Sequence, residues 1–202
     1  MKTCHIVGGG NFSPELITKG EDDIIIAADA GYKSLTEAGI TPDVTIGDFD
    51  SFVGDIPSDA IILPTHKDDT DISAAIHEGD LRGYKNFCLY GALGGSRFSH
   101  SIANLSLLNH ISTRGGSGRI IDKMCEITLF EAGEHTVSVD SFHKISLFPV
   151  GDAAEVSLEG FAYPLSHYTF TCNFPLGVSN EISEERGVIK VHRGKVFCIF
   201  DD

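Results

Sequence analysis

The hydrophobic pattern of this chain changes near its middle, and this change constrains the fold more than any other feature. In the first half, short apolar runs alternate with segments of helical periodicity. The expected strands are Cys4–Val7, Ile24–Ala28, Val44–Ile46, Ala60–Leu63, Asn86–Tyr90 and Arg119–Ile121. The expected helices are Tyr32–Ala38, Thr70–Leu81 and Ser99–Ile111. Strands that alternate with helices indicate a mostly parallel sheet with helices on both faces.

From about Lys123 onward, after the glycine-rich connector Arg114–Gly118, there is little helical periodicity. Short apolar runs separated by Gly, Asp or Pro take its place. They are Glu126–Phe130, His135–Val139, Lys144–Phe148, Glu155–Leu158, Val188–Val191 and Val196–Phe200. Such a series indicates a small all-β sandwich or barrel. We therefore expect an α/β N-terminal domain over residues 1–122 and an all-β C-terminal domain over residues 123–202.

The acidic composition limits the classes of partner. The 202 residues include 29 Asp and Glu against 15 Lys and Arg, a net charge of −14. Nonspecific nucleic-acid binding depends on phosphate neutralisation and is disfavoured by such a balance. The five cysteines are scattered without a C-x-x-C pair, which favours a reducing, cytoplasmic compartment. No signal-peptide pattern or apolar stretch of membrane-spanning length occurs, so we expect no membrane partner.

Two carboxylates, Asp48 and Asp50, directly follow the apolar run Val44–Ile46 and Gly47. Like charges repel where water is scarce, so two acids at the exit of a buried strand usually need a cation. Mg²⁺ is the usual choice, because it takes a few carboxylates together with phosphate oxygens. The alternative is that both acids are ordinary turn residues. The pair alone does not decide between these interpretations.

A second acidic cluster, Asp68-Asp69-Thr70-Asp71, directly precedes an expected helix. Thr70 is a suitable N-cap and acids favour helix N-termini, so the cluster also has a purely structural explanation. Both acidic clusters follow successive strands of a presumed parallel sheet, and ligands collect at the carboxyl ends of such strands. On the functional interpretation, Asp71 joins Asp48 and Asp50 around a metal ion.

The glycine-rich turn Gly91–His100 lies between an expected strand and an expected helix. Glycines let backbone N–H groups approach phosphate, and the next helix offers its positive end. Arg97 is suited to pair with phosphate oxygens and His100 to donate a hydrogen bond. The signal is weak, because many such turns are only tight turns and the Walker A pattern is absent. Gly8–Gly10 is a still weaker candidate for phosphate contact.

Taken in chain order, these elements resemble the bacterial thiamine pyrophosphokinase (thiamine diphosphokinase) family. That family carries an Asp-Gly-Gly or similar element, then P-D-x-x-x-G-D-F-D-S, D-x-T-D and a G-G-R-x-D-H loop followed by Asn. The matching segments here are Asp29–Gly31, Pro42–Ser51, Asp68–Asp71, Gly94–His100 with Asn104, Ser146–Pro149, Gly160–Leu165 and Gly177–Glu181. The loop departs from the family pattern, because one residue is inserted and Ser99 stands where Asp is expected.

The resemblance implies a homodimer with a Rossmann-like ATP-binding catalytic domain over residues 1–122 and a thiamine-binding β-sandwich domain over 123–202. The implied reaction is Mg²⁺-dependent transfer of pyrophosphate from ATP to the hydroxyl of thiamine, giving thiamine diphosphate and AMP. The implied metal ligands and catalytic residues are Asp48, Asp50 and Asp71, with Asp71 a candidate to orient or deprotonate the hydroxyl. Those implied at ATP are Asp29, Gly31, Lys67, Asp68, Gly94, Gly95, Arg97, His100 and Asn104. Those implied at thiamine are Tyr163, Leu165, Ser179 and Asn180, for which a β-turn and core packing are the alternative explanation.

Two other functions fit part of the pattern. A phosphohydrolase of the haloacid dehalogenase type also has D-x-D after a buried strand, but here two earlier strands precede the motif. A non-catalytic protein that binds thiamine or a nucleotide is the second, and Ser99 is its best support. The products distinguish the three functions. A pyrophosphokinase forms AMP and a diphosphate ester, a phosphohydrolase releases free phosphate, and a binding protein forms neither.

Overall fold

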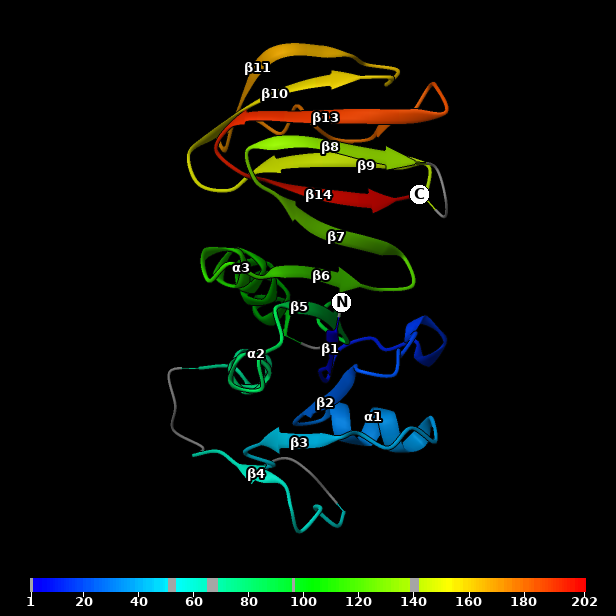
Figure 1. Ribbon diagram of the computed structural model, residues 1–202, viewed down its shortest axis with the longest axis vertical. Coiled ribbons are helices and arrows are strands. Elements are labelled where there is room, and N and C mark those ends of the chain that lie inside the picture. The colour runs from blue at the N-terminus through cyan, green and yellow to red at the C-terminus, as the bar shows by residue number, and fades with distance from the viewer. Residues whose placement is uncertain (1, 51–53, 65–68, 96, 139–141) are drawn as a thin grey trace. The chain divides into compact units, whose positions relative to one another are not determined.

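The computed structural model describes residues 2–50, 54–64, 69–95, 97–138 and 142–202. The chain divides into two compact units, Met1–Lys123 (unit 1) and Met124–Asp202 (unit 2), whose elements are labelled in Figure 1. This division lies where the hydrophobic pattern changes. None of the helices in these described residues is long and apolar enough to cross a membrane.

Unit 1 is built on strands that pair in parallel, in the order β6-β5-β1-β2-β3-β4. Their bounds are β1 Thr3–Val7, β2 Ile24–Ala28, β3 Val44–Gly47, β4 Ile61–Ile62, β5 Asn86–Tyr90 and β6 Ser117–Ile121. β1 is the point of reversal, since Val7 pairs with Ala27 of β2 on one side and with Tyr90 of β5 on the other. The chain therefore adds β2 to β4 on one side of β1, and β5 and β6 on the other.

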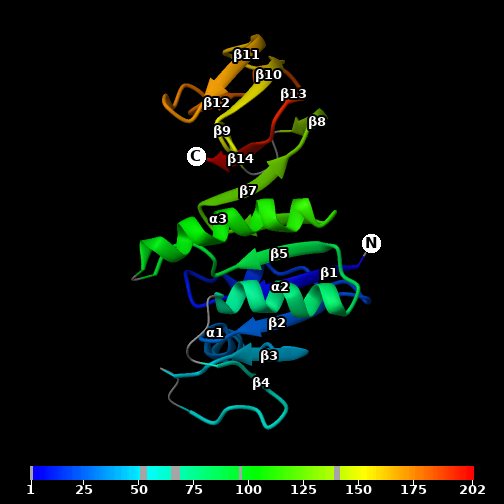
Figure 2. The same cartoon turned by 90° about the vertical axis from the view of Figure 1, so that its left-hand side faces the viewer.

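Helices cover both faces of this sheet, as a near-continuous apolar pattern in parallel strands requires. They are α1 (Gly31–Glu37), α2 (Asp71–Leu81) and α3 (Phe98–Thr113), with a short 3₁₀ turn η1 at Pro14–Leu16. Figure 1 shows α2 and α3 on one side of the strands and α1 on the other. Figure 2, turned by 90°, shows α2 running along β1 and β2. Leu35 of α1 joins the buried side chains of Val7 and Ile25, whereas Gly79 of α2 lies against Cys4 of the opposite face.

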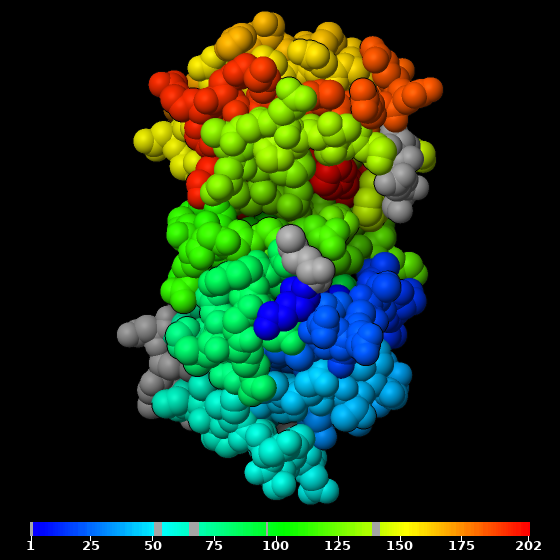
Figure 3. Space-filling view, viewed as in Figure 1, coloured from blue at the N-terminus to red at the C-terminus, as the bar shows by residue number. Residues whose placement is uncertain are grey.

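The edge of the sheet beyond β3 is less buried than its centre. β4 has only two residues, and the side chain of Ile62 is 61% exposed. In Figure 3 the cyan segment around β4 stands out from the rest of unit 1. A short edge strand of this kind offers little backbone for pairing with another chain.

Unit 2 contains two antiparallel sheets, with the orders β12-β9-β14-β7 and β11-β10-β13-β8. Their bounds are β7 Cys125–Phe130, β8 Gly133–Ser138, β9 Lys144–Pro149, β10 Ala153–Glu159, β11 Leu165–Thr171, β12 Asn180–Glu181, β13 Arg186–Arg193 and β14 Val196–Asp201. One buried cluster takes side chains from both sheets, among them Leu147 and Cys198 from the first and Val156 and Ile189 from the second.

The expected strands and helices are confirmed apart from small shifts at their ends, but β11 and β12 were not predicted. Most side chains of β11 are exposed, with Phe170 buried, and the strand is held by antiparallel pairing with β10. An edge strand that buries few side chains carries little hydrophobic pattern, so sequence periodicity misses it. The expected end of one strand, Val139, lies outside the described residues.

Candidate active site

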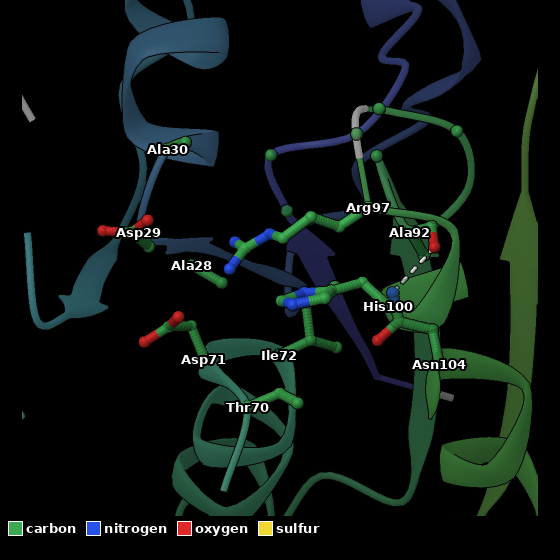
Figure 4. A pocket seen from close by; sticks show the side chains of 16 residues that line it. Ala28, Asp29, Ala30, Thr70, Asp71, Ile72, Ala92, Arg97, His100 and Asn104 are labelled. Carbon is green, nitrogen blue, oxygen red and sulfur yellow. Dashed lines mark hydrogen bonds between the residues drawn. The ribbon is translucent and has the colours of Figure 1, made fainter. Parts of the chain in front are cut away.

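A cavity of about 170 Å³ lies where the carboxyl ends of β1, β2 and β5 meet in unit 1 (Figure 4). Its wall is made by the turns after these strands and by the first residues of α2 and α3. The lining includes Gly8–Gly10, Ala28–Ala30, Thr70–Ile72, Gly91–Ala92, Gly94–Gly95, Arg97, His100 and Asn104. The strand order reverses at β1, and in open α/β sheets ligands bind at such a reversal.

The turns after β1 and β5 are bound tightly to each other. The N–H of Gly8 donates to the carbonyl of Tyr90 at 2.8 Å, and the N–H of Gly10 donates to that of Gly91 at 2.7 Å. A Cβ at position 10 would lie only 2.3 Å from the carbonyl oxygen of Leu93, so a larger residue requires the turn to shift. Gly8–Gly10 looked like a weak candidate in the sequence. The strand order, which the sequence does not reveal, puts this turn at the centre of the cavity wall.

The charges of two carboxylates, Asp71 and Asp48, act on a third carboxylate, that of Asp29, and each of the three comes from a different connection. Asp29 and Asp71 both line the cavity, and Figure 4 shows their carboxylates facing the same space. Asp29 adopts a positive φ of 48°, and its Oδ1 accepts the N–H of Phe49 at 3.2 Å. Burial, together with the negative charges of Asp71 and Asp48, raises the pKa of Asp29. The family resemblance places Asp29 among the ATP contacts, but no sequence pattern groups it with the other acids.

Asp48 and Asp50 are not part of the lining of this cavity, although the charge of Asp48 acts on Asp29. Asp48 is half-buried and its Oδ1 accepts the N–H of Asp50 at 3.3 Å, while the side chain of Asp50 is exposed. Lys67 and Asp68, both expected at ATP, lie outside the described residues.

The donor set is suited to a metal ion that is shared with a ligand. Within the described ranges, no group of three or more His, Cys, Asp and Glu side chains is arranged to hold a metal ion. Mg²⁺ usually takes one or two carboxylates and completes its shell with water and substrate phosphate oxygens. Burial and, after it, the negative charges of Asp71 and Asp48 raise the pKa of Asp29, and a bound cation would offset both costs. The acids present therefore fit Mg²⁺ bound together with a polyphosphate.

The opposite wall of the cavity carries positive charge and N–H donors. Arg97 occupies the N-cap position of α3 without making a side-chain cap, and Figure 4 shows its guanidinium extending into the cavity toward Asp29 and Asp71, beside His100. A helix N-terminus and a guanidinium together favour an anion. Asn104 is 5% exposed and its Nδ2 donates to the carbonyl of Ala92 at 2.7 Å, so it fixes the turn after β5.

Two further residues singled out in the sequence, Gly31 and Ser99, lie outside the cavity wall. Gly31 starts α1 and does not line the cavity, but a Cβ there would lie 1.9 Å from the carbonyl oxygen of Val7. Its role in this structure is the close packing of α1 on the end of β1. Ser99, which replaces the Asp of the family loop, is exposed in the first turn of α3 and is not among the lining residues.

Unit 2 has a second cavity, of about 350 Å³, whose walls are mostly apolar. Buried side chains such as Leu147 and Phe170 form its interior. Three of the four residues expected at thiamine line it, namely Tyr163, Leu165 and Asn180. The fourth, Ser179, is exposed with a positive φ of 57° and is not part of the lining.

Two family models match the chain in the same order as its two units. The model described as "Thiamin pyrophosphokinase, catalytic domain" matches residues 18–117. The model described as "Thiamin pyrophosphokinase, vitamin B1 binding domain" matches residues 134–196. A thiamine pyrophosphokinase of Bacillus subtilis is 32% identical to this chain over 98% of both sequences.

Solved structures agree with these matches. The crystal structure of thiamine pyrophosphokinase from Bacillus subtilis superposes with a TM-score of 0.89 at 29% identity, covering 98% of each chain. The structure of thiamin pyrophosphokinase from Geobacillus thermodenitrificans gives a TM-score of 0.86 at 31% identity, covering 99% of this chain and 97% of the other. The similarity extends through both units.

Proposed function

Because this chain belongs to the thiamin pyrophosphokinase family, we propose that it transfers the pyrophosphoryl group of ATP to the hydroxyl of thiamine, giving thiamine diphosphate and AMP. Membership of this family makes the chain a pyrophosphotransferase. One observation in the structure carries the proposal furthest. A single cavity at the reversal point of a parallel sheet brings together acids, a guanidinium and glycine-rich turns.

ATP binds, on this proposal, in the cavity of unit 1. The glycine turns after β1 and β5 let the backbone approach the polyphosphate, and the uncapped start of α3 offers N–H groups to it. Arg97 and His100 contact phosphate oxygens, and Lys67 is a further phosphate partner. Gly94 and Gly95, both at positive φ, give the loop its close approach. Asn104 keeps the turn after β5 in place.

Acids on the side of the cavity that faces Arg97 would hold Mg²⁺. One or two of the carboxylates of Asp48, Asp50 and Asp71 would bind the ion directly, and Asp29 would add negative potential beside them. When bound, Mg²⁺ neutralises the triphosphate and the charge that develops on the departing AMP. The raised pKa of Asp29, caused by burial and then by the charges of Asp71 and Asp48, supports this assignment, since a nearby cation would favour the ionised carboxylates.

In the reaction, the thiamine hydroxyl oxygen attacks the β-phosphorus of ATP. The new oxygen–phosphorus bond forms as the bond between the β-phosphorus and the α,β-bridging oxygen breaks, and AMP leaves with that oxygen. A carboxylate, for which Asp71 is our candidate, orients the hydroxyl and accepts its proton. Arg97 balances the negative charge of the pyrophosphoryl group during transfer.

The acceptor is held by unit 2. Tyr163 and Leu165 shape the mouth of its apolar cavity, with Ser179 beside it. The pairing pattern of unit 1 supports the description Rossmann-like, and the shared core of the two sheets in unit 2 supports a β-sandwich. These assignments give each unit one substrate.

AMP formation from MgATP and thiamine is the decisive test. A coupled assay should detect AMP only when both substrates are present. Release of free phosphate instead of AMP would favour a phosphohydrolase, and binding of both ligands without AMP would favour a non-catalytic binding protein. Ser99, the main support for that last alternative, is exposed and is not among the lining residues, so the activity assay must decide between them.

We further propose a homodimer in the cytoplasm. Phe98 and Ile102 lie one turn apart on α3 and are 76% and 50% exposed, an apolar surface that a second copy would cover. All five cysteines lie in the described part of the chain and none takes part in a disulfide, which suits a reducing compartment. Light scattering on the purified chain should give twice the monomer mass.

A further inference from the structure

The buried amide of Asn180 is bonded to the backbone of one residue at the mouth of the apolar cavity in unit 2. We propose that Asn180 is a positioning residue, which holds Tyr163 in place and thereby sets the affinity for the acceptor, rather than contacting the acceptor itself. The inference rests on the proposed function for the identity of the acceptor. It revises the expectation from the sequence, which placed Asn180 in direct contact with thiamine.

The hydrogen bonds of Asn180 use both ends of its carboxamide. Its Oδ1 accepts the N–H of Tyr163 at 3.0 Å and the N–H of Glu181 at 2.9 Å, while its Nδ2 donates to the carbonyl of Tyr163 at 2.9 Å. The residue is 8% exposed. A carboxamide accepts through its oxygen and donates two hydrogens, so these bonds leave only one N–H of Asn180 for any other partner.

Asn180 completes a short run of backbone pairing beside the cavity. The N–H of Ala162 donates to the carbonyl of Glu181 at 2.8 Å, and the N–H of Ser183 donates to that of Gly160 at 2.9 Å. The two bonds from Asn180 to Tyr163 extend this pairing by one residue. Pro164 comes next, and it has no N–H with which to continue the pairing.

The turn that precedes Asn180 in the chain is also held in place by hydrogen bonds. Ser179 has a positive φ of 57°, and its N–H donates at 3.0 Å to Oγ of Ser146, a side chain that is 3% exposed. The N–H of Leu147 donates to the carbonyl of Gly177 at 2.7 Å. The turn 177–179 is thereby bound to β9. Asn180 directly follows this turn, so its two hydrogen bonds connect Tyr163 to a part of the chain that is held in place.

Because the cavity is apolar, binding of a ligand there depends on where the ring of Tyr163 is placed. Its described lining is apolar or neutral, so a ligand there is oriented by shape and ring contacts and not by an ion pair. Tyr163 is 70% exposed although its backbone is held by Asn180. An aromatic ring at the mouth gives much contact area, and that contact weakens when the ring moves.

Replacement of Asn180 should therefore affect the acceptor far more than the nucleotide. Asn180→Ala leaves the N–H and carbonyl of Tyr163 without these partners, and Asn180→Asp removes the Nδ2 donor and places negative charge beside that carbonyl. Loss of such buried bonds should raise KM for thiamine about tenfold in both variants. KM for ATP and kcat should stay within about twofold, because only ground-state binding of the acceptor changes.

A double-mutant cycle separates positioning from direct contact. Asn180→Ala is made in the unmodified chain and again in a Tyr163→Ala background, and KM for thiamine is compared in all four proteins. If Asn180 acts through Tyr163, its replacement should have no further effect once the ring is gone. Equal effects in both backgrounds would show that Asn180 contacts the acceptor independently and would overturn the proposal.

Ser157→Ala is the matched control for a general loss of stability. Ser157 is also a buried polar residue of unit 2, and its Oγ accepts the N–H of His167 at 3.0 Å. Its neighbour Leu158 lines the cavity, so by strand alternation Ser157 faces away from it. This variant should lower the melting temperature without changing KM for thiamine. A rise in KM equal to that of Asn180→Ala would overturn the positioning role.

The two hydrogen bonds by which Asn180 holds the backbone of Tyr163 are called the clamp here. A measurement without turnover tests this clamp separately from the proposed function. Hydrogen exchange of the Tyr163 amide, followed by ¹⁵N NMR, should be slow in the unmodified chain and much faster in Asn180→Ala. Unchanged exchange would overturn the clamp whatever the enzyme does. Failure of the unmodified chain to form AMP from thiamine and MgATP would instead refute the proposed function, and faster exchange in the variant would still support the clamp.

Discussion

Asp29 gives the most informative stability prediction, because the charge that suits it to a cation destabilises the ligand-free protein. Burial and the charges of Asp71 and Asp48 raise its pKa, so its ionised form is less favourable in the folded chain than in the unfolded chain. Asp29→Asn removes the charge and keeps an oxygen for the N–H of Phe49. Asn also tolerates the positive φ of 48° at this position.

The expected gain in the free energy of unfolding of Asp29→Asn can be estimated from charge repulsion, desolvation and the hydrogen bond of Phe49. Each like-charge neighbour costs about 0.3 kcal/mol at a partly exposed site, and desolvation adds a comparable amount. A weaker hydrogen bond from Phe49 to a neutral acceptor offsets part of this gain. The ligand-free variant should therefore unfold with a free energy about 0.5–1 kcal/mol higher than the unmodified protein, the usual gain when a functional charge is removed.

Urea unfolding without Mg²⁺ or nucleotide measures this difference. The midpoint should rise while the slope with denaturant stays the same. The folded pKa of Asp29 is raised, so the gain should be complete above that pKa and should vanish as the pH falls toward the ordinary Asp value of about 3.9. With MgATP the order should reverse, because the unmodified protein binds the ligand more tightly and is stabilised more.

Asp23→Asn is the matched control, since it should have the opposite sign. Burial acts to raise the pKa of Asp23, but the N–H groups of Gly20 and Thr3 and the ring of His5 outweigh it and hold the pKa below its usual value. Those N–H groups lie 2.8 and 2.6 Å from its carboxylate oxygens, so loss of the charge should destabilise the fold. Destabilisation by Asp29→Asn similar to that by Asp23→Asn would refute the account of the acidic cluster.

Three further predictions follow from the same structure. Asp48→Asn should abolish turnover while the melting temperature stays within about 2 °C, as measured by AMP formation at saturating Mg²⁺ and by calorimetry; normal activity would contradict the metal assignment. Asp80→Asn should lower the free energy of unfolding by about 1 kcal/mol, because Lys85 and Arg114 contact this carboxylate at 2.9 and 2.7 Å. Although burial opposes it, these two partners lower the pKa of Asp80, so the stability difference should be lost as the pH falls through that lowered value. Gly10→Ala should weaken ATP binding and destabilise unit 1 by about 2 kcal/mol in urea unfolding, since its Cβ would lie 2.3 Å from a backbone oxygen; unchanged nucleotide affinity would contradict its place in the site.

The strands and helices of unit 1 could be predicted because their periodicity is local. Thr70 was expected as an N-cap, and its Oγ1 accepts the N–H of Ser73 at 3.2 Å. The importance of Gly8–Gly10 could not be predicted in this way. It depends on β5 pairing with β1 from the far side, and strand order is a property of the whole sheet.

The acids of the candidate site also could be predicted only in part from local sequence patterns. The positions of Asp48 and Asp71 after strands of one parallel sheet suggested that they meet, but no local pattern tied Asp29 to them. Its link to them depends on a positive φ at the end of β2 and on the neighbouring turn after β3. The departure at Ser99 looked important in the sequence because a loop pattern does not show which side chains face the cavity. The structure places Ser99 in the exposed first turn of α3.

The fate of a label on the γ-phosphate tests the central claim most directly. The purified chain is incubated with Mg²⁺, thiamine and ATP labelled with ³²P at the γ-position, and the products are separated and counted. We predict labelled thiamine diphosphate and an equal amount of unlabelled AMP, with neither formed by Asp48→Asn. Label recovered in free phosphate, or in thiamine monophosphate together with ADP, would contradict pyrophosphoryl transfer at this site.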